Sequence, residues 1–191
     1  MQMNSSRSPA APSMKRFATV VAVVSIATGV LVAQKPEIPK PGPEHQKLGA
    51  FVGNWTFQGE MKPGPMGPGG KMTGTDRIQW LPGNFFVERR FEGKGPMGEI
   101  KGVEVLGYDS AKKVHTFNAF DSLGAMFSGT LTLSGSTWTA SGTGSMGGSV
   151  FHDRCTLAFG DAATTLTIKC EMSADGKAWS PSFEGKATKA K

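Results

Sequence analysis

The stretch that decides the fold is Val150–Met172, with the sequence VFHDRCTLAFGDAATTLTIKCEM. Apolar and polar residues alternate on both sides of its central GDAATT, and a period of two is typical of strands that bury one face. A one-residue shift in pairing would turn every side chain to the other face. The register that gathers the apolar residues on one face pairs Phe159 with Leu166, Leu157 with Ile168, and Cys155 with Cys170. The stretch therefore predicts an antiparallel hairpin.

The same register makes Cys155 and Cys170 cross-strand neighbours. Opposite residues have Cβ atoms roughly 4.5–5.5 Å apart, a separation from which a disulfide can form in an oxidising compartment. We therefore predict a disulfide between them. Two buried free thiols are the alternative, and two lone cysteines are too few to suggest a metal site.

Two further hairpins obey the same rule. A turn at Asp175-Gly176 pairs Met172 with Trp179, Cys170 with Pro181, and Ile168 with Phe183. A loop at Leu81–Asn84 pairs Trp80 with Phe85, Ile78 with Val87, and Asp76 with Arg89. Each register gathers apolar residues on one face, and the second also places a charged pair on that face.

Outward from these hairpins, the alternation runs from Trp55 to Ala187 and is punctuated by Gly, Pro, Asn and Asp. It predicts about ten antiparallel strands, at 55–61, 72–81, 85–92, 99–108, 114–120, 125–133, 137–142, 150–159, 165–172 and 179–187. Before them, Pro43 suits a first helical position and Glu44 the positive end of a helix. We predict an all-β, up-and-down barrel with a short N-terminal helix covering one end. Because a barrel of this width exceeds the eight strands that side chains fill, a cavity is expected.

The N-terminal segment has the features of a secretory signal peptide. Lys15 and Arg16 precede the uncharged run Phe17–Ala33, which ends in small residues. We predict a signal peptide over 1–33, a proline-rich linker over 34–43 and the barrel domain over 44–191. The product would be exported, periplasmic or extracellular, and free of the membrane after cleavage. A retained membrane anchor is the alternative, and either Met1 or Met14 could be the true start.

The chain has 191 residues, 38% of them apolar, and a formal charge of +6. This composition fits one globular domain with a tail rather than a multidomain enzyme. Three of the basic residues precede the proposed cleavage point, and no Lys/Arg cluster is interleaved with aromatics. Nucleic-acid binding therefore has little support.

The best candidate polar site pairs Asp76 with Arg89 on an apolar face that also carries Trp80 and Phe85. Burying either charge alone would cost several kcal/mol, so the two should pair. Arg89 could anchor a carboxylate or phosphate of a ligand while Asp76 holds its guanidinium. Alternatively, the pair is purely structural. Two further residues whose faces are ambiguous could line the same cavity, Glu104 and Asn118.

Three loops expected at one rim carry related methionine motifs, centred on Met66, Met97 and Met146. The sequence leaves three interpretations of them open: flexible surface connections, a portal with adaptable methionines, or thioether capture of a soft metal such as Cu(I). No stretch of the sequence matches the phosphate-loop or the nucleophile-elbow motif. The three histidines are not spaced as metal ligands usually are. We assign no catalytic residue, no metal ligand and no cofactor, and expect no enzyme.

Several short motifs resemble a known bacterial family: Pro43-Glu44-His45 with Leu48, Gly53-Asn54-Trp55, Gly107-Tyr108-Asp109, and Asp175-Gly176 with Trp179. The family is domain of unknown function 1579, and the resemblance covers about 41–186. The opening helix and Gly53-x-Trp55 also resemble calycin barrels such as lipocalins, fatty-acid-binding proteins and nitrobindins. This resemblance implies a ten-stranded barrel with an interior cavity and a helix over its base. Nitrobindins hold haem through a late histidine, but the last one here is His152, so haem is not expected.

These observations favour one function over two others. We expect an exported protein that binds a small, mainly apolar or amphipathic ligand with an acidic group. A structural or interaction domain is the alternative; its interior would be filled by Trp80, Phe85, Trp138, Phe183 and their neighbours. An envelope enzyme ranks third.

Overall fold

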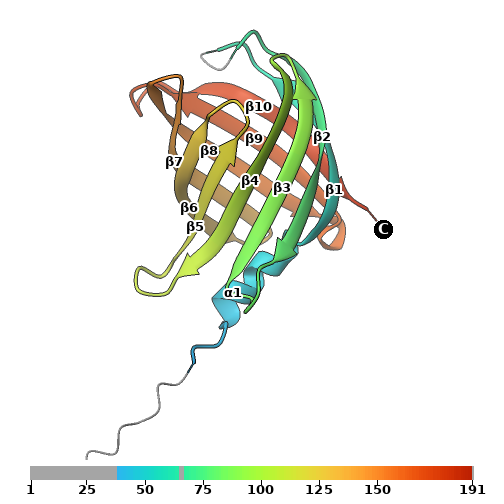
Figure 1. Cartoon of the computed structure of the whole chain (residues 1–191), viewed down its shortest axis with the longest axis vertical. Coiled ribbons are helices and arrows are strands. Elements are labelled where there is room, and N and C mark those ends of the chain that lie inside the picture. The colour runs from blue at the N-terminus through green and yellow to red at the C-terminus, as the bar shows by residue number, and fades with distance from the viewer. Residues whose placement is uncertain (1–37, 65–66, 191) are drawn as a thin grey trace, which may run out of the picture. The chain divides into compact units, whose positions relative to one another are not determined.

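The computed structural model describes residues 38–64 and 67–190, and within them ten strands close into a single antiparallel barrel (Figure 1). The predicted signal peptide and the start of the linker lie outside the described residues, as does Met66. The strands are β1 (Gly53–Met61), β2 (Gly70–Trp80), β3 (Phe86–Gly95), β4 (Gly98–Asp109), β5 (Val114–Asp121), β6 (Met126–Ser134), β7 (Thr137–Met146), β8 (Ser149–Gly160), β9 (Thr165–Ser173) and β10 (Ser180–Lys189). The predicted fold class is confirmed.

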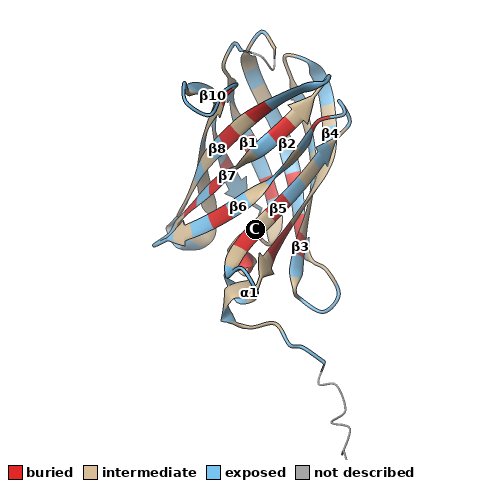
Figure 2. Cartoon of the chain, turned by 90° about the vertical axis from the view of Figure 1, so that its left-hand side faces the viewer, coloured by how far each residue is buried: buried red, intermediate tan, exposed pale blue. Residues whose placement is uncertain are grey.

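Every strand pairs with its neighbours in the chain, and β1 pairs with β10 to close the ring. Along each strand, inward-facing residues alternate with exposed ones (Figure 2). An up-and-down barrel of this kind leaves no free sheet edge. In the part of the chain that the structure describes, no helix has the length and apolar character needed to cross a bilayer.

A short helical segment covers one end of the barrel (Figure 1). It consists of α1 (Pro43–Lys47) and the 3₁₀ turn η1 (Leu48–Ala50). Leu48 is fully buried, and the ring of Phe51 lies 5.4 Å from that of Trp138 and 5.1 Å from that of Phe159. The indole of Trp55 donates a hydrogen bond to the Phe51 carbonyl (2.8 Å). The closed end is therefore packed with side chains.

The β8–β9 hairpin has the predicted register, with Cys155 opposite Cys170. The predicted β9–β10 register is wrong, because Met172 lies opposite Ser180. Asp175 accepts hydrogen bonds from the backbone N–H groups of residues 177 and 178, which holds a loop over 174–179 in place of a two-residue turn. A bulge between Pro181 and Phe183 then places Phe183 opposite Cys170.

The β2–β3 hairpin differs from prediction by two residues, since Trp80 lies opposite Val87. Asn84 has a positive φ of 58° and donates its N–H to the Leu81 carbonyl, so the loop is wider than the predicted four residues. A shift of two keeps every side chain on its face. The inward face is therefore as predicted, although Asp76 lies opposite Phe91 instead of Arg89.

Inward-facing glycines accommodate aromatic rings inside the barrel. A Cβ built on Gly102 would come within 2.2 Å of the Phe91 ring and 2.5 Å of the Phe120 carbonyl. A Cβ on Gly144 would come equally close to the ring of Phe151. These glycines let the rings lie against bare backbone.

We expect Gly102→Ala to lower the free energy of unfolding by about 1–3 kcal/mol, because the methyl group must displace both the Phe91 ring and a neighbouring strand. Urea denaturation measures the change. Ser128→Ala is the control, because it alters an exposed strand position and should change stability little. Gly98→Ala is unsuitable, because the φ of 98° at Gly98 would strain any other residue. Equal stability of Gly102→Ala and wild type would contradict this packing.

Candidate ligand-binding site

The β3–β4 turn lies at the end of the barrel opposite the helical cover (Figure 1). A cavity of about 220 Å³ is lined by residues in and near this turn. Almost all of its wall is apolar, and the single carboxylate among the lining residues is that of Asp121. The lining residues come from seven strands and two turns: Met61, Met72, Phe91, Gly95, Met97, Gly98, Ile100, Asp121, Leu123, Phe127 and Phe183. The barrel is thus packed at one end and hollow near the other.

Methionines form the most adaptable part of this wall. A Cβ on Gly95 would meet Met72 at 3.5 Å and Met61 at 3.8 Å, so the two side chains converge where Gly95 has none. Thioether side chains adjust to ligand shape at little cost. Of the three rim methionines predicted from the sequence, Met97 lines the cavity, Met146 is not among its lining residues, and Met66 lies outside the described residues.

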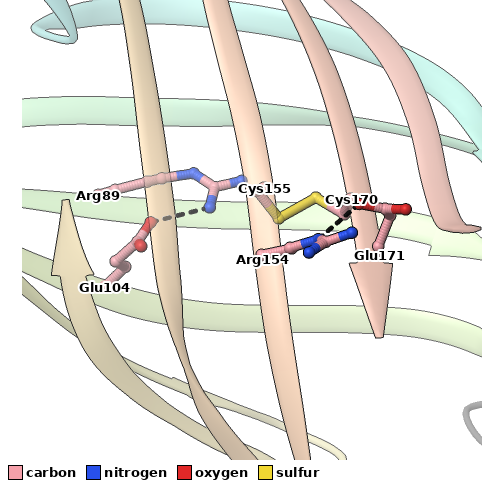
Figure 3. The surroundings of a disulfide bond; sticks show 6 residues. All are labelled: Arg89, Glu104, Arg154, Cys155, Cys170 and Glu171. Carbon is pink, nitrogen blue, oxygen red and sulfur yellow. Dashed lines mark hydrogen bonds and ion pairs between the residues drawn. A yellow bond between two sulfur atoms is a disulfide. The ribbon is translucent and has the colours of Figure 1, made fainter. Parts of the chain in front are cut away.

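Between the cavity and the packed end, Arg89 bridges two carboxylates. Its Nη2 donates to Asp76 Oδ1 and its Nη1 to Glu104 Oε2, each at 3.0 Å (Figure 3 shows the Glu104 pair). Burial alone would lower the pKa of Arg89, but the charges of Asp76 and Glu104 outweigh it and raise that pKa. The guanidinium therefore stays charged and holds both acids.

The Arg89 cluster adjoins the cavity. Phe91 lines the cavity, and the Arg89 guanidinium carbon lies 4.8 Å from the centre of the same ring. Although both side chains point inward, 30% of Arg89 and 18% of Glu104 remain accessible. The lumen beside them is therefore not filled.

Asp153, which sequence reasoning missed, is the third inward-facing acid at this level. It is 9% exposed, and its Oδ1 is buried with no hydrogen-bond partner among the described residues. Burial raises the pKa of Asp153, and the charge of Glu104 raises it further. The alternation that places Cys155 inward also places Asp153 inward, and that signal would have identified it.

We expect Asp153→Asn to stabilise the protein at neutral pH. The native pKa of Asp153 is raised above its ordinary value of 3.8, so the unfolded chain binds fewer protons than the native one and wild-type stability falls as pH rises above that value. Urea denaturation of both proteins across pH should show a gap that closes as pH falls toward 3.8. A constant gap, or none, would contradict this account.

Three other predicted site residues do not join this group. Trp80 and Phe85 belong to the closed end: a Cβ on Gly49 would lie 3.7 Å from the Trp80 indole, and the Phe85 ring is 5.1 Å from that of His45. Asn118 is exposed, and its neighbours in β5, Phe117 and Ala119, take the inward positions.

The predicted disulfide is confirmed, with Cys155 and Cys170 joined between β8 and β9 (Figure 3). The alternative of two free thiols is therefore wrong. On the outer face of the same strands, Arg154 pairs with Glu171 at 2.6 Å. Across the described residues, no three side chains from His, Cys, Asp and Glu gather closely enough to hold a metal ion.

The geometry defines a class: a closed ten-stranded antiparallel barrel with a helical cover at one end and an apolar cavity near the other. The chain belongs to the family described as "Protein of unknown function (DUF1579)", whose model matches residues 40–189. Comparison with functionally curated proteins gives no match.

One solved structure shares the barrel fold. The crystal structure of Rv2717c from M. tuberculosis has a TM-score of 0.57 at 13% identity, over 78% of this chain and 99% of that chain. A de novo designed fluorescence-activating beta barrel gives a TM-score of 0.41 at 17% identity, over 74% of this chain and 95% of that one. At 13% identity, the similarity to Rv2717c shows a shared barrel fold and nothing about function. The similarity to the designed barrel is too low for any conclusion.

Proposed function

We propose that this protein binds a small, mainly apolar molecule in the cavity near the open end of its barrel. The observation that carries the proposal is the cavity itself, about 220 Å³ with an almost wholly apolar wall. Concave, mainly apolar pockets with a few polar groups are the usual form of small-molecule sites. The methionines of the wall suit ligands of varied shape.

An acidic group on the ligand, held by Arg89, is what the sequence predicts. In the barrel, Arg89 already holds Asp76 and Glu104, so an added anion would meet a cluster with one more negative than positive charge. The geometry therefore supports apolar binding better than recognition of an acid.

Export is the second part of the proposal. The disulfide supports it, because such bonds persist in oxidising compartments. A signal peptide over 1–33 and a linker over 34–43 would deliver the barrel, 44–191, to the periplasm or the exterior. N-terminal sequencing of the mature protein should find a start near residue 34.

We expect Gly95→Leu to weaken binding of the neutral probe N-phenylnaphthylamine by about ten-fold or more, because the new side chain fills the cavity between Met61 and Met72. Fluorescence titration measures the affinity. Lys94→Leu is the matched control, since Lys94 is the exposed neighbour of Gly95. Binding that is absent in wild type, or equal in both variants, would refute the proposal.

A further inference from the structure

The barrel interior carries more acid than base next to the cavity. Arg89 is shared by Asp76 and Glu104, and Asp153 has no basic partner among the described residues. A buried carboxylate without a partner is costly, and buried polar groups in native proteins are normally satisfied. Within the described residues, Asp153 is therefore the one buried side chain of this interior whose hydrogen bonding the protein leaves incomplete.

Asp153 and Glu104 both face the barrel interior, from strands that do not pair. They lie on β8 and β4, which are not neighbours in the ring, so the effect of Glu104 on Asp153 passes through the interior. Glu104 is also paired with Arg89, which in turn holds Asp76, and the titratable side chain of His152 precedes Asp153 in β8.

The lumen beside the Arg89 cluster has space for a small group. The inward-facing side chains of Arg89 and Glu104 remain 30% and 18% accessible. Phe91 connects this level to the cavity, because its ring lines the cavity and also contacts the Arg89 guanidinium. A ligand whose apolar part fills the cavity could extend its head toward Asp153.

We propose that the ligand is a cationic amphiphile, an apolar molecule with a protonated nitrogen, and that Asp153 and Glu104 receive this nitrogen below the cavity. The inference rests on the proposed function and names the class of ligand. An ammonium group supplies three N–H donors, and Asp153 Oδ1 is a buried acceptor with no partner among the described residues. It also balances the excess negative charge, which neither an alcohol nor a carboxylate does.

Three probes with the same chain separate the possibilities: octylamine, octanol and octanoate, titrated calorimetrically into the wild-type protein at neutral pH, where the amine is protonated. We expect octylamine to bind about ten-fold more tightly than octanol, because a charge-assisted hydrogen bond replaces a neutral one. Octanoate should bind most weakly. Equal affinity for amine and alcohol would overturn the inference while leaving the proposed function intact.

Variants locate the head group. Asp153→Asn should reduce the octylamine-to-octanol affinity ratio to about one, whereas Glu171→Gln, on the outer face beside Cys170, should keep the wild-type ratio. Loss of the ratio in Asp121→Asn but not in Asp153→Asn would place the nitrogen at the rim and overturn the inference. Preference for octanoate would restore Arg89 as an acid anchor, and failure of all three probes to bind would remove the proposed function as well.

Discussion

Replacing Arg89 with Met is expected to lower the free energy of unfolding by about 3 kcal/mol, because it leaves two inward-facing carboxylates without their shared cation. Asp76 is the more buried of the two, with a side chain 9% exposed. Met fills much of the volume of Arg, so the fall in the free energy of unfolding measures the loss of the charge rather than a loss of packing. Denaturation in urea at neutral pH measures it.

The matched control for this change is Arg154→Met. Arg154 also forms a short ion pair, with Glu171 at 2.6 Å, but both side chains are about 40% exposed. Surface pairs contribute about 1 kcal/mol or less. Combining Arg89→Met with Asp76→Asn and Glu104→Gln should restore most of the lost stability. Equal destabilisation by the two single variants would show that the interior cluster is solvated like a surface pair.

Removing the disulfide by Cys155→Ala with Cys170→Ala is expected to cost about 3 kcal/mol. The bond closes a loop between residues 15 apart, and the chain-entropy account gives about that value for such a loop. The double variant should therefore unfold at lower denaturant than the oxidised wild type. Scanning calorimetry offers a second measure, in the same buffer.

Reduced wild-type protein is the control for side-chain loss at these positions. If the constraint on the unfolded chain dominates, reduction alone should reproduce most of the destabilisation. A double variant as stable as the oxidised protein would mean that the β8–β9 pairing is already fully maintained without the bond.

The period of two predicted nearly all of this fold because the barrel buries one face of every strand. The β8–β9 hairpin was predicted in register, since its short connection and its paired apolar residues admit one alignment. Loops held by side chains are less predictable: the Asp175 hydrogen bonds and the positive φ of Asn84 set loop lengths that residue type alone does not fix. The β2–β3 shift of two residues kept the predicted inward face, whereas the one-residue shift at the start of β10 turned Pro181 outward, opposite Glu171.

The site was less predictable than the fold. Alternation brought Asp76 and Arg89 together and left Glu104 as a candidate, and all three meet in the structure. Alternation does not give height along the barrel, so Trp80 was expected beside a ligand and lies instead near the helical cover. The cavity depends on where aromatic rings lean against glycines, which only the packed interior determines.

The most direct test of the central claim, that the barrel holds an apolar molecule near its open end, is a crystal structure of the protein soaked with iodooctane. Iodine gives an anomalous signal that locates the ligand without interpretation of weak density. We predict a signal inside the barrel among Met72, Phe91 and Phe127. Signal on the outer surface alone, or an interior whose rings close the cavity, would contradict the account.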